Sequence, residues 1–203
     1  MTPTPLSFLA IGDSYTIGEM VETSQRWPNQ LVQLLATENV NFQLPIPIAH
    51  TGFTTDELLT SIRQFNINGK FDLVSLLIGV NNQYRNYSIE KYATEFAELL
   101  QYAILRANNK SRVFVVSIPD WGFTPFGEQD KRGAIEIGKE IDLYNKIAQQ
   151  ICKKNDVQFI DITGISKNHD STLLATDQLH PSGKQYRLWA EKIFENLKDI
   201  FNH

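Results

Sequence analysis

Three side chains in this sequence have the types and the spacing of a serine nucleophile with its base. Ser14 follows the apolar run 8–11 and a Gly-Asp turn, and Asp177 lies three residues before His180. Pro181 disfavours helical geometry at His180, so we expect His180 on a turn. There Asp177 can accept a hydrogen bond from one ring nitrogen, which leaves the other to take a proton from Ser14. The pattern predicts nucleophilic catalysis by Ser14.

Strands and helices alternate along the chain and must position these residues. Apolar runs predict five strands, and apolar residues at helical spacing predict a helix after each of them. A polar stretch separates the fifth strand from the final helix. The expected strands cover residues 8–12, 41–48, 71–78, 112–118 and 157–162, and the expected helices cover 26–37, 54–65, 88–104, 137–151 and 186–197. Such alternation predicts an α/β fold with a parallel sheet covered by helices on both faces.

Small or polar residues end the first three strands of this sheet. Ser14 follows the first strand, Gly52 the second and Asn81 the third. Because parallel strands end at the same edge, we expect these residues to share one rim, where open α/β sheets place their ligands. His50 lies beside Gly52, and we expect it to have a structural role.

Composition limits the classes of function. The chain has 203 residues, a net charge of −4 and no basic block, so we expect one domain over residues 1–203 and no nucleic-acid partner. Cys152 is the only cysteine, and no segment has the features of a signal peptide or a membrane span. We expect a cytoplasmic protein without stable membrane insertion. His169 lies near Asp161 and Asp170 without ligand-type spacing, so no metal and no cofactor is expected.

The motifs together resemble the SGNH hydrolases, the GDSL-type esterase/lipase family. The matching blocks are Gly12-Asp13-Ser14, Gly52, Gly79-Val80-Asn81-Asn82 and Asp177-Gln178-Leu179-His180. The sequence departs from the family pattern at Tyr15, where the name motif has leucine, and at Asn82, where the third block usually has aspartate. Neither departure replaces a catalytic atom, so they bear on the subfamily and the substrate.

The resemblance implies a fold, an activity and roles for five residues. The fold is a three-layer α/β/α sandwich, flavodoxin-like, with a five-stranded parallel sheet. Ser14 is the implied nucleophile, His180 the base and Asp177 its orienting group. The implied oxyanion hole consists of the backbone N–H groups of Ser14 and Gly52 and the side-chain amide of Asn81. The activity is hydrolysis of small-molecule carboxylic esters, and the sequence favours small or short-acyl esters, including acetyl esters.

Further residues near these blocks are candidates for binding the substrate. Asp13 and Tyr15 flank the nucleophile, and Tyr84 and Arg85 follow Asn81, where they could meet the alcohol or sugar side of an ester. The long loop 119–130 carries aromatic residues that could form an acyl-binding wall or a lid, or simply pack the loop. These aromatic residues are Trp121, Phe123 and Phe126.

Three other classes of protein fit parts of the pattern. An α/β-hydrolase needs the elbow G-x-S-x-G, but Thr16 stands at the final glycine position, and its nucleophile follows a later strand. A phospho-acceptor receiver needs an aspartate at the end of the third strand, where Ile78 and Gly79 stand. A non-catalytic, flavodoxin-like ligand-binding module is the main alternative, and a missing triad residue would indicate it.

Overall fold

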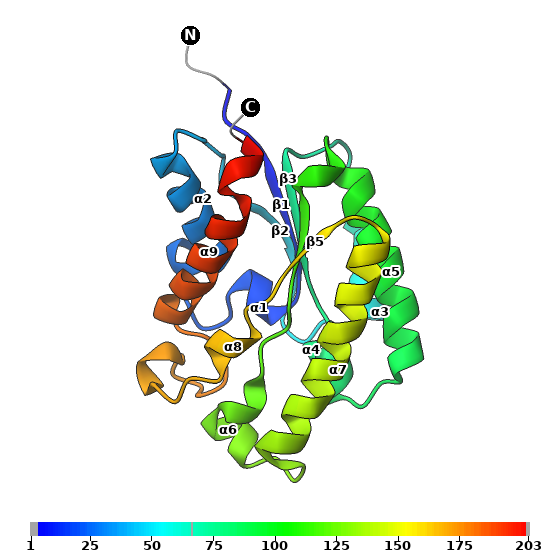
Figure 1. Ribbon diagram of the computed structural model, residues 1–203, viewed down its shortest axis with the longest axis vertical. Coiled ribbons are helices and arrows are strands. Elements are labelled where there is room, and N and C mark those ends of the chain that lie inside the picture. Colours follow the sequence, from blue (N-terminus) through cyan, green and yellow to red (C-terminus); the bar gives the residue numbers. More distant parts are fainter. Residues whose placement is uncertain (1–3, 66, 202–203) are drawn as a thin grey trace.

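The computed structural model describes residues 4–65 and 67–201, and a parallel sheet lies at its centre (Figure 1). The strands are β1 (Phe8–Gly12), β2 (Ile46–Ala49), β3 (Leu73–Leu77), β4 (Val113–Val116) and β5 (Gln158–Ile160). Their order is β2-β1-β3-β4-β5, and every neighbouring pair is parallel. This is the flavodoxin-like order of doubly wound sheets, and it confirms the predicted five-stranded parallel sheet.

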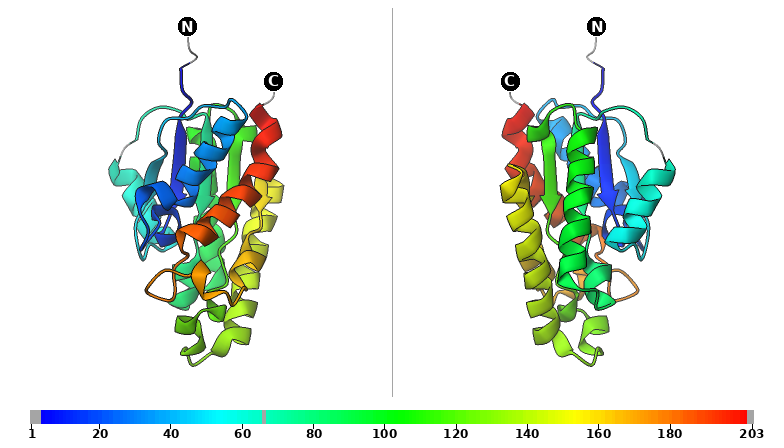
Figure 2. Two further views of the ribbon diagram at one scale, coloured as in Figure 1. Left: turned by 90° about the vertical axis from the view of Figure 1, so that its left-hand side faces the viewer. Right: turned by 90° about the vertical axis from the view of Figure 1, so that its right-hand side faces the viewer.

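Long helices cover both faces of the sheet. Figure 2 shows α2 (Trp27–Thr37) and α9 (Gly183–Leu197) side by side over one face. The other face is covered by α3 (Thr55–Phe65), α5 (Ile89–Arg106) and α7 (Gly133–Lys154) (Figures 1 and 2). Each long helix buries one apolar stripe against the sheet, which gives the expected three-layer sandwich.

Short helices fill the connections near the carboxyl ends of the strands. They are α1 (Ser14–Ile17), α4 (Val80–Tyr84), α6 (Pro125–Glu128) and α8 (Thr163–Ser166), with 3₁₀ turns at Thr23–Gln25, Lys110–Arg112, Trp121–Phe123, Ser171–Leu173 and Lys198–Phe201. The sequence predicted a long loop over 119–130, and this was wrong in detail, because the segment contains the 3₁₀ turn Trp121–Phe123 and helix α6. Helices of four or five residues contain too few turns to show a periodic apolar stripe.

The core explains why the central strands read as continuous apolar runs. All residues of β1, β3 and β4 are buried, because helices lie on both sides of them. The edge position of β2 agrees with its prolines at 45 and 47, since proline cannot donate to a strand ladder. Cys152 of α7 is fully buried, and burial raises the pKa of its thiol to about 12. Across residues 4–65 and 67–201, no helix combines the length and the apolar character needed to cross a membrane.

The strand register brings three strand ends to one level. Gly12 at the end of β1 pairs with Leu77 of β3 on one side and with Ala49 of β2 on the other. Residues that follow these three positions therefore emerge at the same rim of the sheet.

Candidate active site

Ser14 sits at the sharp turn between β1 and α1. At Gly12, an added Cβ would lie 2.2 Å from the Thr16 hydroxyl oxygen and 2.4 Å from the Leu77 carbonyl oxygen, so only glycine fits. Asp13 then caps α1, because its Oδ1 accepts a hydrogen bond from the N–H of Tyr15 at 3.0 Å. Ser14 is the first residue of this helix and is 4% exposed. The turn thus places Ser14 at the carboxyl end of β1, an interior strand of the sheet.

Asp177 and His180 form the pair that their spacing predicted. Oδ2 of Asp177 lies 2.6 Å from Nδ1 of His180, and Oδ1 accepts hydrogen bonds from the N–H groups of Leu179 and His180 at 3.1 and 3.0 Å. Gln178, between them, adopts a φ of +60°, which lets the turn close. With Nδ1 donating to the carboxylate, Nε2 is the ring nitrogen left to accept a proton.

The same contacts keep Asp177 ionised. Burial by itself raises the pKa of Asp177, but the hydrogen bonds from the His180 ring and from the two backbone N–H groups outweigh it. They hold the pKa of this carboxyl below its usual value. A negative charge beside Nδ1 would stabilise an imidazolium at His180 if Nε2 accepted a proton.

Ser14 and His180 line one cavity of about 180 Å³. Tyr15 lines it as well, and its ring packs against the rings of His180 and Trp189 at centroid distances of 5.6 and 5.9 Å. Within the described part of the chain, the Ser14 hydroxyl makes no hydrogen bond to His180. In proteins without bound substrate, the contact between a nucleophile and its base is often longer than a hydrogen bond and tightens when substrate binds.

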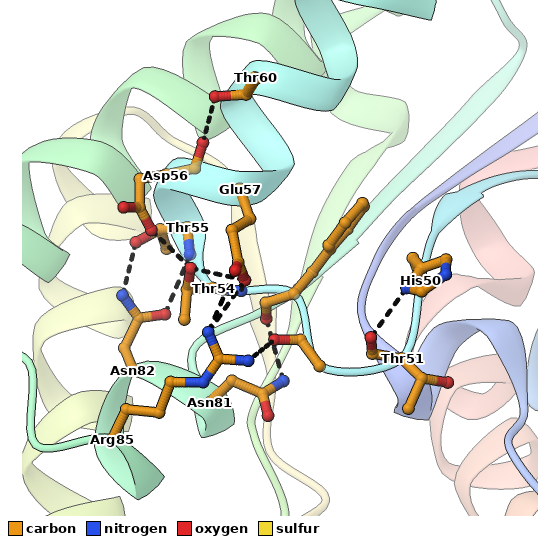
Figure 3. A network of polar contacts seen from close by, with 12 residues as sticks. His50, Thr51, Thr54, Thr55, Asp56, Glu57, Thr60, Asn81, Asn82 and Arg85 are labelled. Atoms are coloured by element: carbon orange, nitrogen blue, oxygen red, sulfur yellow. Dashed lines mark hydrogen bonds and ion pairs between the residues drawn. The ribbon is translucent and has the colours of Figure 1, made fainter.

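Gly52 and Asn81 lie on the same cavity, as the shared rim predicted. Among the described residues, no acceptor meets the backbone N–H of Ser14 or of Gly52. The side-chain amide of Asn81 donates one hydrogen bond, 3.0 Å long, to the Phe53 carbonyl (Figure 3), and its second N–H has no protein acceptor in the described chain. Three free N–H donors therefore border the cavity, and such donors stabilise a developing oxyanion.

Aromatic side chains from two segments form the apolar wall of the cavity. Tyr84 of α4, Trp121 and Phe126 pack together with ring centroids 5.5 to 6.4 Å apart. The Trp121 indole N–H donates to Oε1 of Gln83 at 2.8 Å, and this buried bond fixes the ring. Two of the three aromatic residues of 119–130, Trp121 and Phe126, thus line the cavity.

Three predicted substrate-binding residues lie away from the cavity lining. Asp13 is fully buried and acts as the cap of α1, and Arg85 binds Glu57 and the Gly52 carbonyl. Phe123 is partly buried, and its ring packs against that of His169 at a centroid distance of 5.8 Å. Across residues 4–65 and 67–201, no cluster of three or more His, Cys, Asp or Glu side chains is arranged to hold a metal.

Three lining residues were not singled out by sequence reasoning. They are Thr51, Val80 and Leu179. Each one directly adjoins a predicted site residue, namely Gly52, Asn81 and His180. Their position next to a motif was therefore the only feature of the sequence that could have indicated them, because none of the three carries a charged side chain.

Comparison with known proteins agrees with this site. The model of the GDSL-like Lipase/Acylhydrolase family matches residues 10–188, which span every block named above. No curated protein matches the chain. Among solved structures, TesA superposes with a TM-score of 0.74 at 18% identity, covering 95% of this chain and 98% of TesA.

Two further solved structures have the same fold. The acetylxylan esterase Axe2 from Geobacillus stearothermophilus has a TM-score of 0.72 at 20% identity, with 97% of this chain and 96% of Axe2 covered. The lipase/acylhydrolase from Enterococcus faecalis has a TM-score of 0.70 at 22% identity, with 96% of each chain covered. The family match over most of the sequence shows that this chain belongs to the GDSL-like lipase/acylhydrolase family and is a carboxylic ester hydrolase.

Proposed function

We propose that the protein hydrolyses small, short-acyl carboxylic esters, including acetyl esters, through an acyl-enzyme on Ser14. The observation that carries this proposal is the convergence on one cavity of Ser14, the Asp177–His180 pair and three unpaired N–H donors. A buried serine requires both a base and an oxyanion site to act as a nucleophile, and the position of His180 and of these N–H donors supports the two roles. The non-catalytic ligand-binding alternative lacks support, because no triad residue is missing.

The proposed reaction proceeds in two steps. The Ser14 oxygen attacks the ester carbonyl carbon while its proton moves to Nε2 of His180. The negative charge that forms on the carbonyl oxygen is bound by the N–H groups of Ser14, Gly52 and Asn81. His180 then donates its proton to the departing alcohol, and the acyl group remains on Ser14. A water molecule activated by His180 releases the acid and restores the serine.

Cavity size supports the preference for short acyl groups. Its volume of about 180 Å³ is smaller than the roughly 300–1,000 Å³ that is typical for pockets holding drug-sized ligands. The wall of Tyr84, Trp121 and Phe126 suits the apolar face of a small acyl or alcohol group. The acetylxylan esterase with the same fold acts on an acetyl ester by its name, which agrees with this size class. The cytoplasmic location stays a prediction from the sequence.

The test is hydrolysis of p-nitrophenyl esters from acetate to laurate by the wild type and by Ser14→Ala. We expect turnover to be highest with the shortest chains and to fall by up to about 10⁶ in the variant, as in other serine-triad enzymes. Equal rates in the two proteins would refute Ser14 as the nucleophile. A preference for laurate over acetate would refute the short-acyl assignment while leaving the mechanism intact.

A further inference from the structure

Three consecutive carbonyl groups next to the proposed oxyanion site are each held by a side chain. His50 Nδ1 lies 2.8 Å from the Thr51 carbonyl oxygen, Arg85 Nη2 donates to the Gly52 carbonyl oxygen at 2.8 Å, and Asn81 Nδ2 donates to the Phe53 carbonyl oxygen at 3.0 Å. Figure 3 shows these contacts converging on the turn between β2 and α3. Most loop carbonyls at a protein surface face water, so three successive side-chain anchors indicate a turn whose orientation is specified.

Arg85 makes the most extensive of these contacts. Besides the Gly52 carbonyl, its Nη1 donates to both carboxylate oxygens of Glu57, at 3.1 and 3.2 Å. Glu57 in turn accepts the N–H of Thr54 at 2.9 Å, at the start of α3. The guanidinium therefore ties Gly52 to the first turn of α3 through a planar fork, a geometry that lysine does not reproduce.

Helix α4 brings Arg85 to this turn together with Asn81. Arg85 follows the last residue of α4, and its N–H bonds to the Asn81 carbonyl oxygen, four residues earlier. Side chains four residues apart lie on the same face of a helix. Asn81 thus reaches the cavity, and Arg85 reaches around the outer side of the same turn.

The two peptide groups that meet at Gly52 are each anchored by a side chain. Gly52 has a φ of +87°, and as a glycine it has no Cβ that would restrain rotation about its backbone bonds. An added Cβ would lie 3.4 Å from Arg85 Nη2. The Gly52 N–H shares a planar peptide group with the Thr51 carbonyl, which His50 holds, whereas the Gly52 carbonyl held by Arg85 belongs to the next peptide group. With both peptide groups held, the φ and ψ angles of Gly52 between them are limited, and so is the direction of its N–H. Glycine loses more conformational freedom than other residues when it is fixed, so an external anchor matters most here.

We propose that Arg85 is a positioning residue, which fixes the Gly52 carbonyl and so, together with the His50 contact on the preceding peptide group, holds the Gly52 N–H in line with the oxyanion. The inference rests on the proposed function of Ser14 and goes beyond it, because Arg85 acts from outside the cavity lining. This role replaces the substrate contact expected for Arg85 from its place after Asn81.

The experiment compares Arg85→Met, Arg85→Lys and a matched control, Arg63→Met, by steady-state kinetics on p-nitrophenyl acetate. Arg63 also pairs with a glutamate, Glu98 at 2.8 Å, and it lies on α3 away from the cavity. Both arginines are exposed at the surface, and such ion pairs add little to stability, so all variants should keep a Tm within about 3 °C of the wild type.

For Arg85→Met, we expect kcat to fall by roughly 10- to 100-fold with KM within about twofold of wild type, because a misdirected donor affects the transition state more than the bound ester. Arg85→Lys should recover part of the loss, since one N–H can still reach the Gly52 carbonyl. Arg63→Met should match the wild type.

Two results would overturn the proposal. One is a kcat for Arg85→Met within twofold of the wild-type value, and the other is a raised KM with unchanged kcat, which would show that Arg85 contacts substrate. Ser14→Ala and Asn81→Ala, measured in the same series, separate this outcome from failure of the proposed function. If these two lose activity while Arg85→Met does not, only the positioning role is refuted. If Ser14→Ala keeps full activity, the serine mechanism itself is refuted.

Discussion

Asp13 places a carboxyl group where the fold favours its neutral form. The side chain is 0% exposed, its Oδ1 accepts one hydrogen bond from the Tyr15 N–H, and its Oδ2 has no hydrogen-bond partner among the described residues. Burial raises the pKa of Asp13 from 3.8 to about 7, and the backbone hydrogen bonds offset only part of that effect. We therefore predict that Asp13→Asn changes the way stability depends on pH.

The sign follows from the protons bound in each state. An unfolded chain releases the Asp13 proton near pH 4, whereas the folded protein keeps it until about pH 7. Between these values the folded state binds one more proton, so raising the pH lowers the free energy of unfolding. Three pH units at 1.36 kcal/mol each give a loss of about 4 kcal/mol, which is complete above pH 7. Asparagine keeps the acceptor for the Tyr15 N–H and has no proton to lose.

Urea unfolding of the wild type and Asp13→Asn at half-unit steps from pH 4.5 to 8 measures this effect. Other titrating groups cancel in the difference between the two proteins, and an unpaired amide N–H in the variant adds an offset that does not depend on pH. The variant should gain stability relative to the wild type as pH rises, and the difference should become constant above pH 7. A difference that stays constant across the whole range, with equal m-values, would refute the buried neutral carboxyl.

Two further predictions concern the catalytic pair and the wall of the cavity. Asp177→Asn should lower kcat by about 10⁴ with little change in Tm, because the amide no longer holds the His180 tautomer; steady-state kinetics with a thermal melt would check this, and a loss below tenfold would contradict it. Phe126→Ala should enlarge the cavity and raise the ratio of kcat/KM for hexanoate over acetate, by roughly fourfold for each methylene newly buried. Activity on a chain-length series would measure that ratio, and an unchanged ratio would place the acyl group elsewhere.

Much of this architecture could be predicted because the central strands are buried on both faces. Their apolar runs end at glycine or polar residues, so the strands, their parallel arrangement and the shared rim could all be inferred from the sequence alone. The Asp177–His180 pair was equally accessible, since three residues and a proline suffice to define the turn that joins them. The catalytic roles of these residues remain proposals that kinetics must test.

Directions of side chains on short helices could not be predicted. Arg85 was expected at the substrate because it follows Asn81, yet α4 turns it behind the loop toward Glu57. Trp121 and Phe123 were expected to act together, but they belong to one 3₁₀ turn, where residues two positions apart point in different directions. Helices and turns of only three to five residues are too short to show a periodic pattern in the sequence, so the directions of their side chains could not be inferred.

The chain positions of the proposed nucleophile and its base bear on how activity arises during synthesis. Ser14 lies near the beginning of the sequence and His180 near its end, and the helices that flank them, α2 and α9, pack against each other. Ribosomes add about 5–20 residues per second, so roughly ten seconds or more separate the appearance of the two residues. If Ser14 and His180 act as proposed, the growing polypeptide carries a serine without its base during that interval, and hydrolysis would begin only after the segment with His180 has been made and has folded against the rest.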